Sequence, residues 1–268
     1  MPNVIENVAK RKLREGRLVL SLSVNQMRTP NIGLVAAACG YDAIYCDLEH
    51  NPTSLETAAA VCVAALPTGV TPICRVGSHD PHLIARVLDC GAQGVMVPHV
   101  GTAEEANAAV EAVRFPPLGQ RSAFSQAPTL GYMTPPQGEL HQLLNEQTLL
   151  VVMLETPEAV ENADAIAAVE GIDVVHIGST DLSTGMGVPG EYRHPLMRAA
   201  YEKVAAAAKR HGKSMGVGGV RNDPEFLGWL MDIGVRSLTG ASDLGFILQG
   251  GKADVEETRQ IGARRMGA

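Results

Sequence analysis

Short runs rich in valine and isoleucine recur along the chain and alternate with alanine-rich stretches of helical periodicity. The apolar runs are continuous, which predicts strands buried on both faces, as in parallel sheets. The expected strands cover residues 17–23, 42–47, 71–76, 93–98, 149–154, 173–177, 214–218 and 235–239. The expected helices lie near residues 31–39, 54–65, 81–90, 103–114, 157–169, 195–211, 223–233 and 242–263.

Eight strand–helix repeats in a chain of 268 residues are what an α/β fold of the (β/α)8, or TIM-barrel, type requires. A doubly wound parallel sheet is the alternative that this pattern leaves open. A barrel that lacked half of its strands would expose open sheet edges. We therefore expect residues 1–268 to form a single barrel domain.

Residues 115–138 interrupt this rhythm, because they are rich in proline, glycine and glutamine. An irregular segment of this length inside a compact domain is usually a functional loop. It follows the fourth strand–helix unit, a position from which we expect it to reach over the mouth of the barrel.

Composition narrows the class of protein further. The formal net charge is −7 and no stripe of lysine or arginine is present, which argues against nucleic acid or an anionic membrane as the main partner. No apolar run approaches the ~18 residues of a membrane-spanning helix, and the first residues do not resemble a signal peptide. The five cysteines form no C-x-x-C pair and mostly lie within apolar runs. They are interpreted as buried thiols in a reducing, cytoplasmic protein.

Polar residues that could carry chemistry follow several of the expected strands. Catalytic groups of a TIM barrel lie at the carboxyl ends of its strands, where the sequence places His50, Arg75, Glu155 and Asp181. None of the six lysines falls at such a position, so a Schiff-base mechanism is not expected. The sequence thus favours acid–base or metal-assisted chemistry at this end of the barrel.

Glu155 and Asp181 come from neighbouring strands, so their carboxylates are expected to converge. Two hard oxygen ligands with open positions suit Mg²⁺ or Mn²⁺, completed by water and substrate oxygens. The alternative is that both acids merely favour helix N-termini, since Pro157 and Leu182 follow them closely.

Arg75 and His50 also admit two interpretations. Arg75 lies inside an apolar strand, where it is either a cation directed at an enolate or carboxylate oxygen or an ion-paired structural arginine. His50 is either a general base or a loop histidine that caps a helix.

Six ordered motifs make the chain resemble the HpcH/HpaI aldolases, class II pyruvate aldolases of the phosphoenolpyruvate/pyruvate barrel superfamily. The motifs occupy residues 45–50, the strand that carries Arg75, and residues 87–93, 114–121, 154–156 and 177–183. The resemblance extends in order from about residue 17 to residue 250. It implies a divalent-metal-dependent aldolase that cleaves or forms a 4-hydroxy-2-oxo acid through a pyruvate enolate, with an aldehyde as the other product.

The resemblance also implies a role for each matching residue. Glu155 and Asp181 would hold the metal ion (Mg²⁺, Mn²⁺ or Co²⁺), and Arg75 would stabilise the enolate oxygen. His50 would move protons together with Asp89, which an adjacent subunit supplies in this family. The substrate carboxylate would be held by backbone amides of three residues, namely Gly178, Ser179 and Thr180. The family forms dimers that assemble into hexamers by exchanging a C-terminal helix, which residues 242–263 would supply.

Three residues depart from the family pattern, so the substrate or the reaction could differ. Met153 stands where a glutamine is common beside the metal glutamate, Ser179-Thr180 replaces a usual Pro-Ala, and Ser122 replaces a usual glycine. Two alternatives therefore remain beside the aldolase. One is a related enolate-forming lyase, either a decarboxylase or a CoA-ester lyase. The other is a non-catalytic barrel that binds an oxo acid.

Overall fold

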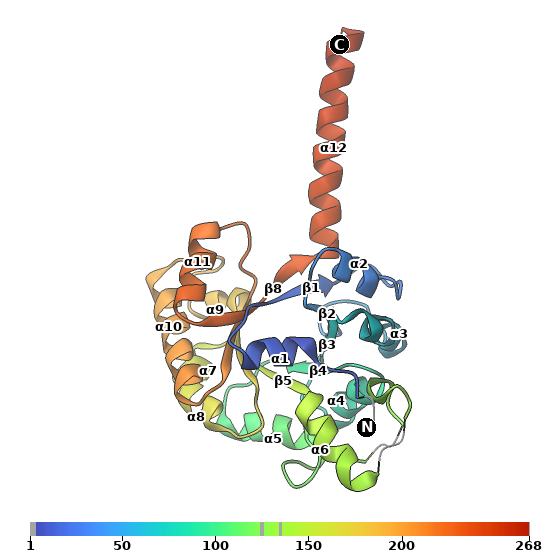
Figure 1. Ribbon diagram of the computed structural model, residues 1–268. Helices are drawn as coiled ribbons and strands as arrows, with labels where there is room; N and C mark the ends of the chain where they lie inside the picture. Colours follow the sequence, from blue (N-terminus) through green and yellow to red (C-terminus); the bar gives the residue numbers. More distant parts are fainter. Residues whose placement is uncertain (1–3, 124–125, 134–135, 268) are drawn as a thin grey trace.

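Eight parallel strands close into a barrel, in which each strand pairs with its neighbour in sequence and β8 pairs with β1 (Figure 1). The computed structural model describes residues 4–123, 126–133 and 136–267. The strands are β1 Val19–Val24, β2 Ala43–Asp47, β3 Thr71–Arg75, β4 Gly94–Val97, β5 Leu149–Leu154, β6 Val174–Gly178, β7 Ser214–Gly218 and β8 Val235–Ser242. All eight expected strands are confirmed, and the barrel excludes the doubly wound alternative.

Helices follow the strands along the chain, and each expected helix is present. They are α1 Val8–Arg14, α2 Ile32–Ala38, α3 Leu55–Ala65, η1 Leu66–Thr68, α4 Pro81–Asp89, α5 Ala103–Val113, η2 Pro128–Leu130, α6 Gln137–Gln147, α7 Pro157–Glu161, α8 Ala163–Ala168, α9 Ser179–Gly185, α10 Pro195–Arg210, α11 Pro224–Asp232 and α12 Asp243–Met266. The helix expected over 157–169 is divided in two at Asn162. Three α-helices (α1, α6 and α9) and the two short 3-10 helices η1 and η2 were not expected from the sequence.

The continuous apolar strands are buried on both faces, as the sequence pattern predicts. Every residue of β2, β4 and β5 is buried. Strand residues that face outward pack with the helices in one large hydrophobic layer. Those that face inward form a second cluster, which also contains Ala9 and Leu13 of α1. The N-terminal helix thus closes the amino end of the barrel with apolar side chains.

The proline-rich segment lies at this closed end and not over the mouth, so that expectation is wrong for its described residues. The backbone N–H of Ile5 donates to the carbonyl of Thr129, and Arg121 pairs with Asp89 at the end of α4. The physical reason is topological, because residues 115–138 connect a helix to the following strand and such connections lie at the amino ends of the strands. Residues 124–125 and 134–135 of this segment lie outside the described residues.

The last helix, α12, leaves the barrel instead of covering it (Figure 1). Asp243 is its only buried residue, and the carboxylate of Asp243 accepts hydrogen bonds from the backbone of the loop after β1. The expected helix over 242–263 is therefore confirmed. Across the described residues, no helix combines the length and the apolar character needed to cross a bilayer.

A buried ion-pair network ties α1 to the closed end of the barrel. The ammonium of Lys10 and the guanidinium of Arg114 both contact the carboxylate of Asp173, and both cations are almost fully buried. Burial lowers the pKa of Lys10 to about 8, although Asp173 opposes this shift.

This pKa shift predicts how the stability of the protein depends on pH. Between pH 8 and the ordinary lysine pKa, the folded chain has released the Lys10 proton while the unfolded chain retains it, so the free energy of unfolding rises with pH. We expect the difference in unfolding free energy between the wild type and Lys10→Met to grow in favour of the wild type over this range. Urea unfolding at a series of pH values measures it. A difference that stays constant or shrinks would contradict the assignment.

Candidate active site

A cavity of about 460 Å³ opens at the carboxyl ends of the strands and is lined from every strand except β4. Seven of the predicted site residues line it, namely His50, Arg75, Glu155, Gly178, Ser179, Thr180 and Asp181. Two larger cavities, of about 640 and 620 Å³, lie at the closed end beside α1. The polar groups that could perform chemistry nevertheless converge at the open end, where TIM barrels carry their active sites.

Glu155 follows β5 directly and its side chain is buried. Its carboxylate lies against Gly178 of β6, where an added Cβ would be 2.7 Å from Oε1. Burial raises the pKa of Glu155 to about 7; His99 opposes this effect, and the nearby carboxylate of Asp181 reinforces it. Burying an unpaired carboxylate costs free energy, so Glu155 requires a cationic partner in order to be ionised.

Asp181 lies in the first turn of α9, at the edge of the same cavity. Glu155 precedes Thr156, whose hydroxyl caps α7 by accepting a hydrogen bond from the amide of Ala159. Both acids therefore lie at helix N-termini, as the helix-terminus interpretation requires. Both also face the cavity, as the metal-ligand interpretation requires. The two interpretations are compatible.

The chemistry of these two acids fits a divalent cation. Oε2 of Glu155 is buried and has no aligned hydrogen-bond donor among the described residues, although Nδ1 of His99 lies 2.7 Å away. Gly178 has no side chain, so the carboxylate can lie directly against its backbone. Carboxylate oxygens with room for further oxygen ligands are the donor set that Mg²⁺ and related ions prefer.

Arg75 is held by two carboxylates at the end of β3. Its Nε and Nη2 donate to the two oxygens of Asp47 at 2.9 and 2.7 Å, and Nη1 lies 3.1 Å from Glu49. The ring of Tyr45 lies 5.6 Å from the guanidinium carbon. Although burial opposes the change, the hydrogen bond with Asp47 raises the pKa of Arg75 above its ordinary value. Arg75 is thus ion-paired, as the structural interpretation requires, and the same side chain also lines the cavity, as the functional one requires.

Two histidines flank the acids. The side chain of His50 is 61% exposed, and its Nε2 lies 3.8 Å from a carboxylate oxygen of Glu49. His99, at the end of β4, has a positive φ of 53° and directs its two ring nitrogens at Glu49 and Glu155, at 2.9 and 2.7 Å. In the sequence His99 follows an expected strand, but this position alone does not predict that the ring bridges Glu49 and Glu155.

Asp89 does not lie in the cavity of its own chain. It is the last residue of α4, at the closed end of the barrel, where its carboxylate accepts a hydrogen bond from Arg121 at 2.6 Å. Within one chain it cannot assist His50. The role that the resemblance gives it, in the site of an adjacent subunit, stays a prediction.

The segment after β6 offers backbone donors to the cavity. Helix α9 starts at Ser179, and no described side chain caps its first turn. The hydroxyl of Ser179 accepts a hydrogen bond from Tyr201 at 2.9 Å, and that of Thr180 lies 3.3 Å from Tyr192. These contacts fix the loop while its first amide groups remain available to an anionic group.

A parallel barrel with acids, an arginine and histidines gathered at the carboxyl ends of its strands defines the molecule as a (β/α)8-barrel enzyme. The family model described as HpcH/HpaI aldolase/citrate lyase matches residues 26–233, and the chain belongs to this family. It is an aldolase, a carbon–carbon lyase. Of the interpretations that the sequence left open, the comparisons support the catalytic aldolase.

Relatives match over most of the chain. It is 42% identical over 226 residues to the 4-hydroxy-4-methyl-2-oxoglutarate aldolase of Hapsidospora irregularis, which covers 84% of each protein. It is 35% identical over 216 residues to the 4-hydroxy-2-oxo-heptane-1,7-dioate aldolase of Shigella sonnei, which covers 80% of each. The crystal structure of an HpcH/HpaI aldolase from Desulfitobacterium hafniense superposes with a TM-score of 0.88 at 30% identity, over 93% of this chain and 96% of that one.

The contact between Gly178 and Glu155 generates a prediction. Gly178 has a φ of −83°, which alanine adopts without strain, so Gly178→Ala should displace only the Glu155 carboxylate. We expect Mn²⁺ affinity to fall about 10- to 100-fold, the usual cost of disturbing a residue that supports a metal ligand. Isothermal titration calorimetry with Mn²⁺ measures the change.

Gly228→Ala in α11 is the matched control, because an added Cβ meets no atom within 4 Å there. This variant should bind Mn²⁺ like the wild type. Unchanged affinity in Gly178→Ala would show that the Glu155 carboxylate does not depend on this contact.

Proposed function

We propose that the protein cleaves a 4-hydroxy-2-oxo acid into pyruvate, or a close 2-oxo acid, and an aldehyde, and that the reaction depends on a divalent cation. The observation that carries this proposal is the buried carboxylate of Glu155, whose Oε2 has no aligned hydrogen-bond donor among the described residues and which shares a cavity with Asp181. Membership of the aldolase family and the names of the relatives support the reaction class.

Glu155 and Asp181 would hold the cation, and Mg²⁺, Mn²⁺ and Co²⁺ all suit this use of oxygen ligands. When bound, such a cation supplies Lewis-acid polarisation of the substrate's keto group. The backbone amides of residues 178–180 would bind the substrate carboxylate, since the first turn of α9 has no side-chain cap.

Arg75 would stabilise the enolate oxygen. A guanidinium has five N–H groups, and three of these are directed at Asp47 and Glu49. The remaining donors can face the cavity while the carboxylates hold the planar group in one orientation. Such preorganisation places positive charge where negative charge develops during the reaction.

His50 would transfer protons through water, because its side chain is the most exposed basic group of the cavity lining and lies at the entrance. In the full assembly Asp89 would reach it from an adjacent subunit. His99 would act differently, since it already contacts both Glu49 and Glu155 and can hold the Glu155 carboxylate in position.

The aldehyde side of the substrate would meet a less polar wall than in typical aldolases of this type. Met153 is buried and lines the cavity beside Glu155. A thioether offers no strong hydrogen bond, so this position would favour apolar substituents over hydroxyl groups on the substrate.

We also propose that the chain acts as one catalytic domain in a homo-oligomer, with dimers that assemble into a hexamer and exchange α12. The support is the apolar surface that α12 leaves uncovered within one chain, formed by Leu244, Phe246, Ile247, Leu248, Val255 and Ile261. A helix of 24 residues that packs only through its first turn needs a further partner for this surface. A reducing, cytoplasmic location fits the five free cysteines.

Proton exchange tests the proposed chemistry without knowledge of the aldehyde. Pyruvate incubated with the protein and Mn²⁺ in D₂O should lose its methyl proton signal in NMR spectra, and EDTA should stop the exchange. Glu155→Ala and Asp181→Ala should each slow it by about 100-fold or more, since Lewis-acid stabilisation is worth several kcal/mol.

Glu158→Ala is the control for these variants, because Glu158 is an exposed acid three residues from Glu155. It should exchange protons at the wild-type rate. Exchange that ignores EDTA, or wild-type exchange in either cavity variant, would refute the metal-dependent mechanism.

The proposed exchange of α12 is tested by Ile247→Glu, which places a charge on its exposed apolar surface. We expect the variant to fold but to assemble less far than the wild type, because a charge buried without a partner opposes the interface. Light scattering coupled to size-exclusion chromatography measures the masses. Glu257→Gln, which changes an exposed polar residue of the same helix, should leave the mass unchanged, and an unchanged mass in Ile247→Glu would contradict the exchange.

A further inference from the structure

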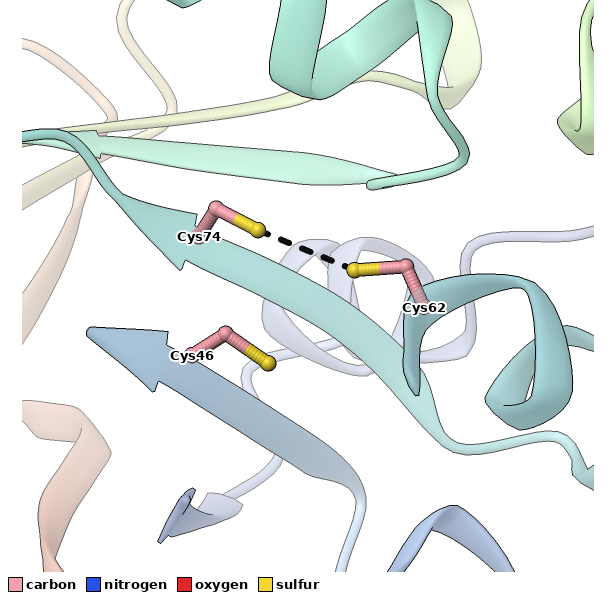
Figure 2. Close-up of side chains that lie close together, drawn as sticks. All are labelled: Cys46, Cys62 and Cys74. Carbon is pink, nitrogen blue, oxygen red and sulfur yellow. Dashed lines mark hydrogen bonds between the residues drawn. The ribbon is translucent and has the colours of Figure 1, made fainter. Parts of the chain in front are cut away.

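Three cysteine sulfurs meet outside the barrel, away from the cavity. Cys46 of β2, Cys74 of β3 and Cys62 of α3 direct their side chains into one space between the helix and the two strands (Figure 2). All three sulfurs lie within 4.8 Å of one another, and those of Cys62 and Cys74 are 3.7 Å apart. Each residue is only 1% exposed.

The strand register explains why this cluster is separate from the active site. Cys46 pairs with Cys74, and the next residues, Asp47 and Arg75, pair in turn. Successive side chains of a strand point to opposite faces, so the thiols face α3 while the ion pair faces the cavity. The three thiols belong to the hydrophobic layer between strands and helices.

The three thiols lie among apolar side chains, and contacts with Cys62 and Cys74 lower the pKa of Cys46. Contact with the Cys46 sulfur, together with burial, raises the pKa of Cys62 and Cys74. A net charge in an apolar interior is costly unless it is paired. A ligand that suits this cluster must therefore bind three sulfurs and leave no net charge behind.

Common thiophilic ions meet this condition poorly. Zn²⁺ in closed sites takes four ligands, and no histidine, aspartate or glutamate of the described residues joins the group of three cysteines. Three thiolates around Zn²⁺ or Cu⁺ would also leave one or two negative charges in the apolar layer. A trivalent ion with three thiolates leaves none.

We propose that Cys46, Cys62 and Cys74 form a binding site for trivalent arsenic, taken up as arsenous acid. Three S–H bonds and three As–OH bonds break, three As–S bonds form, and the three protons leave with the three hydroxides as water. No atom changes oxidation state and no charge enters the interior. The neutral product distinguishes arsenous acid from Zn²⁺ and Cu⁺, which would leave negative charge in the apolar layer.

The geometry requires little rearrangement. Three sulfurs bonded to one centre at about 2.3 Å, the length of a zinc–thiolate bond, lie about 3.5 to 4 Å apart. The sulfurs of Cys62 and Cys74 already have this separation, and Cys46 needs to approach them only slightly. Because the site is sealed, uptake should be slow and should follow local opening of α3.

Mass spectrometry of the intact, reduced full-length protein with sodium arsenite tests this site. The expected product carries one arsenic atom and lacks three hydrogens. X-ray absorption at the arsenic edge should show three sulfur neighbours and no oxygen. This second measurement uses only the wild-type protein, so it does not depend on whether any variant folds.

Cys46→Ala, Cys62→Ala and Cys74→Ala should each lose the species that lacks three hydrogens, while circular dichroism confirms that they are folded. Cys39→Ala and Cys90→Ala are the matched controls and should retain it, because these cysteines lie outside the cluster. The proposal is overturned if no adduct forms. It is also overturned if the arsenic is bound to only two sulfurs and keeps one hydroxide, or if a Cys62–Cys74 disulfide forms in place of an adduct. Retention of the species in any of the three cluster variants would also overturn it.

Discussion

A carboxylate removed from water must find positive charge elsewhere, and the end of β5 is arranged around this requirement. The Glu155 side chain is buried, lies against the bare backbone of Gly178 and contacts the ring of His99. Asp181 adds negative charge to the same region and so increases the requirement for a nearby positive charge. The residues that approach Glu155 therefore support the proposed cation site more directly than any single motif does.

Most of the scaffold could be predicted, because buried parallel strands leave a strong sequence signature. The run over β5 consists of apolar residues alone, and the structure buries all of them. Of the α-helices that were not predicted, α1 and α9 have only seven residues each, and α9 begins without a break after β6. The location of residues 115–138 was wrong because the side of a barrel on which a segment lies depends on whether it follows a strand or a helix, and this segment follows α5.

The residues of the candidate site could be predicted to the level of the strand end but not to the level of their contacts. His50, Arg75, Glu155 and Asp181 line one cavity, as their positions after strands imply. The pairing of Arg75 with Asp47 and Glu49 depends on the register of β2 against β3 and on side-chain rotamers. The bridging position of His99 depends on a left-handed backbone conformation, which is uncommon for a residue other than glycine.

Helix α1, which closes the amino end of the barrel, limits how substrate and products can enter and leave. Ala9 and Leu13 join the inward-facing side chains, so the interior is filled and offers no passage from one end to the other. Reactants and products must therefore pass through the mouth at the carboxyl ends of the strands. Both fragments made from one molecule therefore have to leave through the same mouth of the barrel.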